Sequence, residues 1–184
     1  MNKSSESQAF FKQTLLNYYQ MENAKCIFTG VENPTAAHLI PKSSMLEEDA
    51  RQLLENVLKN NLHSPLNGLF LADYLERTLD LALWIPILDG THLRIKVAKD
   101  LDLIPSDQKI VVPLCGSQNN PVPSHLISKL KNTLKEYPIS IDLGNKLPAP
   151  EVLKWLERRF EFYLKKRNLL RPEKQWVPKN TNQN

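Results

Sequence analysis

A mixed α+β fold is predicted by two kinds of pattern in the sequence. Apolar residues recur at helical spacing in several separate segments, and the first and last of these lie near the two ends of the chain. Between them, two short strand-like runs flank Asp89-Gly90, a dipeptide typical of tight β-hairpin turns. The 184 residues are enough to bury a core without disulfides, so one domain with a small appendage is expected.

Two helices are predicted in the first part of the chain, at residues 5–20 and 44–60. Each begins with a serine that Gln8 or Glu47 follows three residues later, which is the capping-box pattern. Apolar residues then recur on one face of each segment. Both helices are therefore expected to pack on the rest of the domain.

Three short apolar segments around these helices are expected to be extended. Residues 26–29 follow the first helix, and residues 36–41 surround His38. Residues 67–71 begin with the turn signal Asn67-Gly68. This order places His38 and Asn67 on two different extended segments.

The second half of the chain is expected to contain both helices and strands. The predicted helices span residues 72–83, residues around 126–134, and residues from Pro150 to about 167, since proline is favoured in the first turn of a helix. The predicted strands span residues 84–88, 92–97 and 107–115. Pro121-Val122-Pro123 is expected to form a rigid linker.

Composition excludes several classes of protein. Hydrophobic residues make up 41% and charged residues 24% of the chain, as in ordinary globular proteins. Two cysteines, Cys26 and Cys115, are too few for a disulfide framework or a four-cysteine zinc site. No apolar run approaches the roughly 20 residues that span a bilayer, and the polar first residues contain no signal peptide. We therefore expect a cytoplasmic protein without a membrane partner.

Positive charge is concentrated towards the C-terminal end. The net charge is +4, and from Lys165 onward six lysines and arginines accompany a single acid, Glu173. Such a segment is typical of an arm that binds the phosphate backbone of a nucleic acid, and equally of a solubilising tail.

His38 and Asn67 are candidates for a catalytic role. His38 lies at the end of an apolar segment, where burial favours the neutral imidazole that a general base requires. The alternative is a structural histidine with satisfied hydrogen bonds. Asn67 enters a strand, where its side chain either makes a local turn or holds the loop that carries His38.

Glu76 and Asp80 are candidates for binding a metal ion. They are four residues apart on a predicted helix, which places both carboxylates on one face. Two oxygen ligands in this arrangement suit a hard divalent cation. The alternative is a solvated acidic face, with Arg77 beside it.

Taken in order, these motifs resemble those of the HNH nuclease superfamily. The matching pieces are Cys26-x-x-Thr29-Gly30, Ala37-His38-Leu39-Ile40-Pro41 and Asn67-Gly68-Leu69-Phe70-Leu71. They are most similar to the branch with C-x-x-T-G, A-H-I-x-P and N-G-L-x-L motifs. The likeness extends over residues 9–165, because an aromatic-rich N-terminal helix, a β-hairpin and a Pro150-Glu151-x-Leu153-x-Trp155 segment also match.

The resemblance implies a ββα-metal (HNH) core with flanking helices and an additional β-hairpin. His38 falls at the general-base position, and Asn67 at that of the asparagine that braces the base loop. Glu76 falls where the family has its last histidine ligand, and Asp80 falls at the next ligand position. A single domain is expected over residues 1–170, with its motif core at 24–83, an insert helix at 44–60, a C-terminal helix at 150–167 and a basic, polar tail at 171–184.

Two departures from the family pattern affect the expected metal. Many members carry aspartate or histidine just before the base, where this chain has Ala37. Glu76 replaces a histidine ligand, and glutamate binds Mg²⁺ or Mn²⁺ more readily than Zn²⁺ or Ni²⁺. Ala37 is expected to be tolerated, whereas Glu76 either biases the site towards Mg²⁺ or Mn²⁺ or indicates a degenerate site.

The sequence therefore predicts a metal-dependent endonuclease that hydrolyses DNA phosphodiester bonds, with His38 as its base. The basic residues expected to contact DNA are Lys42, Arg77, Lys165, Lys166 and Arg167. His63 is expected at a loop surface, although its closeness to Asn67 in sequence also allows it to enter the site. A cut through both strands needs two active sites or two visits, which leaves a homodimer open.

Two alternatives remain at this point. One is a catalytically degenerate DNA-binding module that keeps the HNH scaffold without the metal, which Ala37 and Glu76 favour. The other is a helical interaction protein in which the motif match is accidental.

Overall fold

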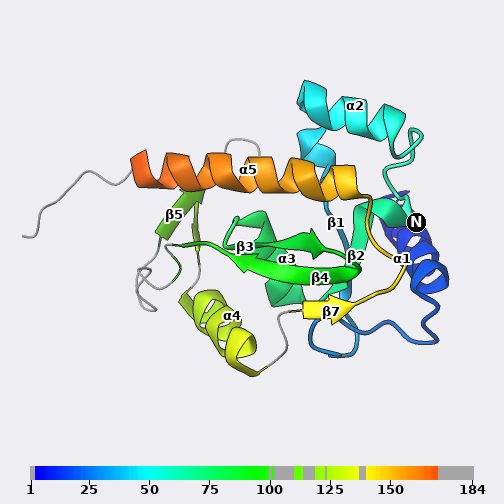
Figure 1. Ribbon diagram of the computed structural model, residues 1–184, viewed down its shortest axis with the longest axis horizontal. Helices are drawn as coiled ribbons and strands as arrows, with labels where there is room; N and C mark the ends of the chain where they lie inside the picture. Colours follow the sequence, from blue (N-terminus) through cyan, green and yellow to red (C-terminus); the bar gives the residue numbers. More distant parts are fainter. Residues whose placement is uncertain are drawn as a thin grey trace, which may run out of the picture.

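The computed structural model describes residues 3–99, 101, 110–113, 119–122, 124–136 and 140–169. Its helices are Lys3–Tyr19 (α1), Glu48–Asn56 (α2), Asp73–Asp80 (α3), Ser124–Glu136 (α4) and Pro150–Leu169 (α5), with 3₁₀ turns at Lys42–Leu46 (η1) and Pro65–Asn67 (η2). Its strands are Thr35–His38 (β1), Gly68–Leu71 (β2), Trp84–Asp89 (β3), His92–Val97 (β4), Ile110–Pro113 (β5), Asn119–Val122 (β6) and Ser140–Asp142 (β7). Helices combined with short antiparallel sheets confirm the predicted α+β fold (Figure 1).

β1 and β2 form a two-stranded antiparallel ribbon within the predicted motif core. Thr35 pairs with Leu71 at one end of the ribbon, and His38 pairs with Gly68 at the other. Every residue of β2 is buried. Both α1 and α3 contact the ribbon. It therefore joins the N-terminal helix to the helix that carries the two candidate carboxylates.

Gly68 allows α1 to approach this ribbon closely. A Cβ atom at Gly68 would lie 2.4 Å from the ring carbon Cζ of Phe11, far inside van der Waals contact. Phe11 and Leu15 are fully buried and occupy this space. Because Gly68 has no side chain, the Phe11 ring can lie beside the end of β1 that carries His38.

A second antiparallel sheet contains β3, β4 and β7, with β4 in the middle. In Figure 1, α5 runs above this sheet and α4 lies below it. Trp84 of β3 and Trp155 of α5 are both buried in the core. Lys96 of β4 forms ion pairs with Glu157 (2.9 Å) and Glu161 (2.8 Å), which tie the sheet to α5. Within the described part of the chain, none of the helices has the length and apolar character needed to cross a membrane.

Two expectations for the N-terminal part are wrong. Ser5 lies inside α1 and so does not cap it, and Gln8 instead donates a hydrogen bond to the carbonyl oxygen of Ala36 (2.9 Å). Residues 26–29 form a turn and not a strand, closed by a 2.8 Å hydrogen bond from the Gly30 N–H to the Cys26 carbonyl. The Ile27 N–H donates to the carbonyl of Phe70 in β2 (2.9 Å), but the chain reverses at once, so this contact does not extend into a ladder.

The helix predicted over residues 44–60 is divided into η1 and α2. Ser44 lies inside η1, where its hydroxyl is buried, so it does not cap α2. α2 begins after Glu47, whose side chain makes no capping bond and pairs with Arg159 of α5. The carboxylate of Glu47, which the predicted capping box requires, is therefore engaged in the ion pair with Arg159.

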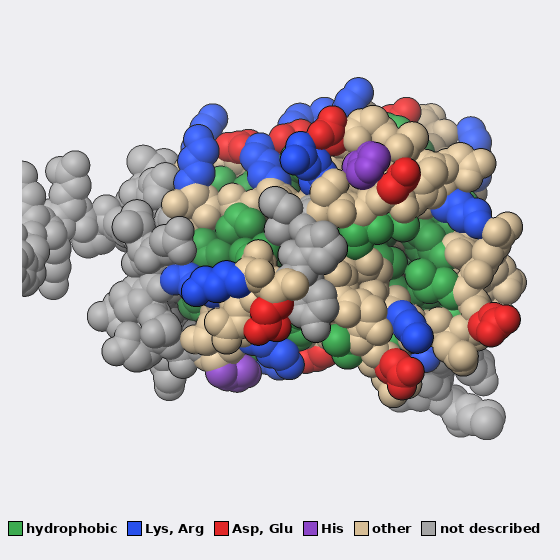
Figure 2. Space-filling model, turned by 60° about the horizontal axis from the view of Figure 1, so that its bottom comes forward, with side chains coloured by type: hydrophobic (Ala, Val, Ile, Leu, Met, Phe, Trp, Pro, Cys, Tyr) green, Lys and Arg blue, Asp and Glu red, His purple; other side chains and the backbone are tan. Residues whose placement is uncertain are grey.

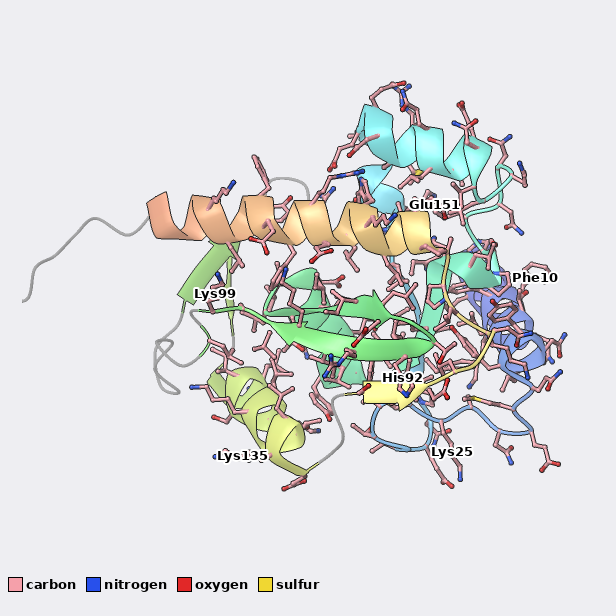
Figure 3. The ribbon with its side chains drawn as sticks, viewed as in Figure 1. Phe10, Lys25, His92, Lys99, Lys135 and Glu151 are labelled. Carbon is pink, nitrogen blue, oxygen red and sulfur yellow. The ribbon has the colours of Figure 1, made fainter. Side chains whose placement is uncertain are left out.

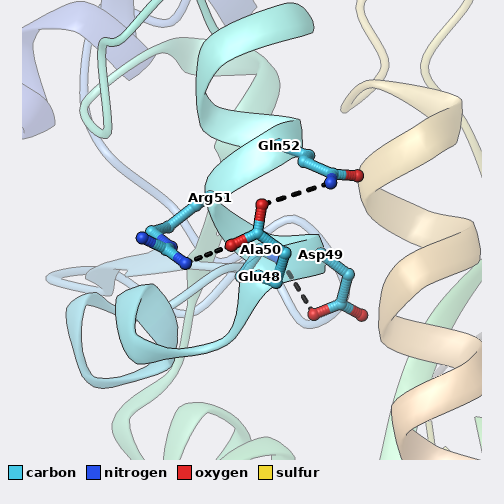
Figure 4. A network of polar contacts seen from close by, with 5 residues as sticks. All are labelled: Glu48, Asp49, Ala50, Arg51 and Gln52. Atoms are coloured by element: carbon cyan, nitrogen blue, oxygen red, sulfur yellow. Dashed lines mark hydrogen bonds and ion pairs between the residues drawn. The ribbon is translucent and has the colours of Figure 1, made fainter.

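The exposed face of α2 is occupied by contacts within the helix (Figure 4). Glu48 pairs with Arg51 and accepts a hydrogen bond from Gln52 (3.2 Å), and Asp49 accepts one from the backbone N–H of Ala50 (2.9 Å). Acidic residues in the first turn favour helix formation, since they offset the positive end of the helix dipole. They also make this insert a poor surface for a polyanion.

The second half of the chain differs from expectation in three places. Pro121 lies in β6, opposite Val111 of β5, so residues 121–123 do not start with a linker. The helix predicted over 72–83 ends at Asp80. The strand predicted over 107–115 contains β5, and its other residues lie outside the described part of the chain. β7 was not predicted, because its three residues form a strand only by pairing with β4.

Candidate functional site

His38 is the last residue of β1, and its imidazole ring stacks on α1. The ring centroids of His38 and Phe11 are 3.9 Å apart, with an angle of 13° between the ring planes. His38 is half-buried, whereas Phe11 is fully buried. One face of the imidazole is therefore fixed against an apolar surface.

His63 holds a second side of the same ring. Nδ1 of His63 lies 3.0 Å from Nε2 of His38, which is a hydrogen-bond distance. The His63 ring is half-buried and lies 5.5 Å from the Phe11 ring. The expectation that His63 lies at a loop surface is wrong, because its half-buried ring packs beside the rings of Phe11 and His38. Its position four residues before Asn67 was the only sequence signal that pointed to the site.

The electrostatics of this pair favour the uncharged imidazole. Burial, and then the neighbouring His63, lower the pKa of His38 from 6.5 to about 4. At neutral pH His38 is therefore uncharged and has one nitrogen able to accept a proton. This is the protonation state that a general base requires before reaction.

Asn67 braces the loop that follows His38. Its side chain is completely buried. Its amide oxygen accepts a hydrogen bond from the Ile40 N–H (2.8 Å), and its amide nitrogen donates to the carbonyls of Ile40 (3.2 Å) and Leu62 (3.0 Å). The backbone of Asn67 also accepts a hydrogen bond from Leu39. One amide thus joins the loop after His38 to the residue before His63, and the local-turn alternative does not describe it.

Glu76 and Asp80 lie one helical turn apart on α3. Burial and then the charge of Asp80 raise the pKa of Glu76, while a hydrogen bond with Thr35 lowers it. The side chain of Asp80 keeps contact with solvent, yet the surrounding protein removes enough water to raise its pKa from 3.8 to about 6. The predicted proximity of the two carboxylates is confirmed. Arg77, on the same helix, is exposed and pairs with Asp73 at 3.8 Å.

The histidine pair and the carboxylate pair contact opposite ends of β1. Glu76 interacts with Thr35 at the start of the strand, and His38 is its last residue, roughly 10 Å further along an extended backbone. Among the residues that the structure describes, no group of three or more His, Cys, Asp and Glu is arranged to hold a metal ion. Of the four predicted side chains, Glu76 and Asp80 form one pair, His38 pairs instead with His63, and Asn67 bonds the loop after His38.

Comparison with known families identifies this part of the chain. Residues 26–85 match the family model described as HNH endonuclease, and this range contains β1, β2 and α3. This segment belongs to the HNH endonuclease superfamily. The narrower branch suggested by the motifs stays a prediction. No curated protein and no solved structure matches the chain.

HNH endonucleases generally use a divalent metal ion, and the donor set of this HNH segment fits one kind of ion. Glu76 and Asp80 supply carboxylate oxygens, and the position before His38 is the apolar Ala37. Mg²⁺ and Mn²⁺ accept one or two protein carboxylates, with water and substrate phosphate as the other ligands. A closed zinc site needs more protein ligands than this pair provides. The two carboxylates therefore fit a divalent ion that completes its coordination with water and phosphate, and they are too few for a structural zinc ion.

The predicted DNA contacts are only partly described. Lys42 is exposed at the start of η1, and Lys165 is exposed near the end of α5. Lys166 and Arg167 belong to α5, but their side chains lie outside the described residues, as do residues 171–184 of the predicted tail.

The other two histidines, His92 and His125, are both exposed.

Proposed function

We propose that this chain is a metal-dependent HNH endonuclease that hydrolyses DNA phosphodiester bonds, with His38 as general base. The observation that carries the proposal is the uncharged imidazole of His38, which contacts Phe11 and His63 at the end of β1. This residue lies in the segment that matches the HNH endonuclease family. Asn67 supports the same assignment, since it locks the loop that begins after His38.

His38 would take the proton from the attacking water. A base with a pKa of about 4 is uncharged at neutral pH but has little affinity for a proton. A DNA phosphate next to the ring would raise that pKa, because a negative charge favours the imidazolium form. Substrate binding would therefore move His38 towards the proton affinity that the reaction needs.

Glu76 and Asp80 would hold Mg²⁺ or Mn²⁺ from one face of α3. When bound there, the ion supplies positive charge that offsets the charge developing on the phosphate and the leaving oxygen. The raised pKa values of both carboxylates are consistent with a pair of negative charges that a cation would neutralise.

A basic hollow that His38 does not line would bind a further part of the DNA backbone. It has a volume of about 580 Å³, and its lining includes Lys99, Lys131 and Lys135 beside apolar residues. Figure 3 shows Lys99 after β4 and Lys135 on α4. Lys99 of the hollow and Lys165 of α5 both lower the pKa of Glu161, so their positive charges act on the same carboxylate. On the face shown in Figure 2, Lys and Arg side chains lie among Asp and Glu side chains, around patches of hydrophobic side chains.

Nicking of supercoiled plasmid DNA tests this function. The wild type should nick plasmid in Mg²⁺ or Mn²⁺ and stop in EDTA, and Glu76→Gln combined with Asp80→Asn should lose at least about 100-fold in rate. Glu48→Gln on the exposed face of α2 is the matched control and should cleave like wild type. Cleavage by wild type in EDTA, or full activity of the double variant, would contradict the proposed metal site.

The second candidate is a DNA-binding module without catalytic activity. It is favoured by Ala37 and by the absence of a three-ligand group among the described residues. Calorimetric titration with Mn²⁺ distinguishes the two functions. DNA binding without any Mn²⁺ binding at millimolar concentration would support the module, and Mn²⁺ binding that is lost in the double variant would support the nuclease.

A further inference from the structure

We infer that His63 is a positioning residue that sets which ring nitrogen of His38 carries the proton. The inference rests on the proposed role of His38 as a base. It assigns Nδ1 of His38 as the atom that accepts the proton of water, and Nε2 as the atom that binds His63.

The surroundings of the His38 ring leave one nitrogen for substrate. Phe11 covers a face of the ring at 3.9 Å, and His63 occupies the Nε2 edge at 3.0 Å. Because stacking and the hydrogen bond restrain rotation about different axes, the ring is held in one orientation. Nδ1 is then the ring nitrogen that is not engaged by either contact.

Proton counting restricts the pair to two arrangements. A hydrogen bond between two ring nitrogens contains one proton, and a neutral imidazole has one donor and one acceptor. If His63 donates from Nδ1, the proton of His38 must be on Nδ1, and that atom cannot act as a base. If His38 donates from Nε2 to Nδ1 of His63, then Nδ1 of His38 is an acceptor. Only the second arrangement is compatible with proton transfer from water.

The second arrangement also suits the product of that transfer. When Nδ1 of His38 takes the proton, the ring becomes an imidazolium with N–H groups at both nitrogens. The Nε2–H group continues to donate to Nδ1 of His63, and a hydrogen bond from a charged donor is stronger than one from a neutral donor. His63 accepts this hydrogen bond through the lone pair of Nδ1, so the proton of its own ring is on Nε2.

Long-range ¹H–¹⁵N NMR of the full-length protein, without DNA or metal, tests the tautomer directly. Wild-type His38 should carry its proton on Nε2, and in His63→Ala it should become a mixture of both tautomers. His63→Asn should restore the wild-type tautomer, because the asparagine oxygen can accept from Nε2. An unchanged single tautomer in both variants would overturn the inference.

Plasmid cleavage by the same proteins is the functional test. His63→Ala should lower kcat by about 10- to 100-fold with little change in KM, and His63→Asn should recover most of that loss. His92→Ala, which replaces an exposed histidine on the hairpin (Figure 3), should cleave like wild type. Full activity of His63→Ala would contradict the positioning role. A change of tautomer in a protein that never cleaves DNA would support the histidine pair and reject only the nuclease function.

Discussion

The two histidines and the two carboxylates of the candidate site are held in different ways. His38 is stacked on Phe11, bonded to His63 and followed by a loop that Asn67 locks. Of the two carboxylates, Glu76 has a hydrogen bond with Thr35, but each lies in surroundings that penalise its charge. The comparison indicates that the fold already fixes the ring of His38, whereas the two carboxylates carry an electrostatic cost that a cation would remove.

The largest loss of folding stability is expected when Asn67 is replaced. Asn67→Ala removes two buried hydrogen bonds with Ile40 and one part-buried hydrogen bond with Leu62, and it leaves these backbone groups without their partner. Leaving buried polar groups unpaired costs about 1–3 kcal/mol each, so a loss of about 3 kcal/mol is expected in urea unfolding. Asn56→Ala, at an exposed position of α2, should change stability by less than about 0.5 kcal/mol. A similarly small change in stability for Asn67→Ala would show that the loop after His38 does not depend on these hydrogen bonds.

A smaller loss is expected when Gly68 gains a side chain. The new Cβ atom of Gly68→Ala would collide with the ring of Phe11, and overpacking of this kind costs about 1–3 kcal/mol. The ring stack on His38 should be disturbed at the same time. Phe11→Leu added to Gly68→Ala should restore part of the stability, which thermal unfolding measures. If the single variant is as stable as wild type, α1 does not depend on the close approach at this residue.

The smallest effect, and of opposite sign, is expected at Asp80. Its pKa is about 6 in the folded protein and 3.8 without the surrounding protein, so the ionised carboxylate destabilises the folded state at neutral pH. Asp80→Asn should raise Tm of the metal-free protein at pH 7.5 by about 2 °C, a small gain because solvent screens the charge. The gain should vanish below about pH 4, where aspartate is protonated in both states. A lower Tm for the variant at pH 7.5 would contradict the proposed electrostatic cost.

Local signals predicted those parts of the fold that depend on neighbouring residues in the chain. The hairpin predicted from Asp89-Gly90 joins β3 to β4, although Asp89 ends β3 and pairs with His92, so that the turn itself is Gly90-Thr91, with Gly90 at a positive φ of 62°. The apolar periodicity also predicted α1, α4 and α5. The capping boxes failed because Gln8 and Glu47 bind partners far away in sequence, Ala36 and Arg159, which no local pattern shows.

In the candidate site too, contacts between residues close in sequence were predicted and contacts between distant residues were not. Helical spacing was enough to pair Glu76 with Asp80, since both lie on α3. The contact between His38 and His63 crosses 25 residues and depends on how the loop before η2 returns to β1. Sequence spacing carries no information about such a return, and for this reason His63 was expected at the surface.

Single-turnover cleavage of duplex DNA by His38→Ala, at saturating Mn²⁺, tests the central claim most directly. General-base catalysis contributes about 10²- to 10⁴-fold, so the rate constant should fall by at least about 100-fold while Mn²⁺ binding is unchanged. His92→Ala provides the matched histidine control. Equal rates for His38→Ala and wild type would remove His38 from the mechanism.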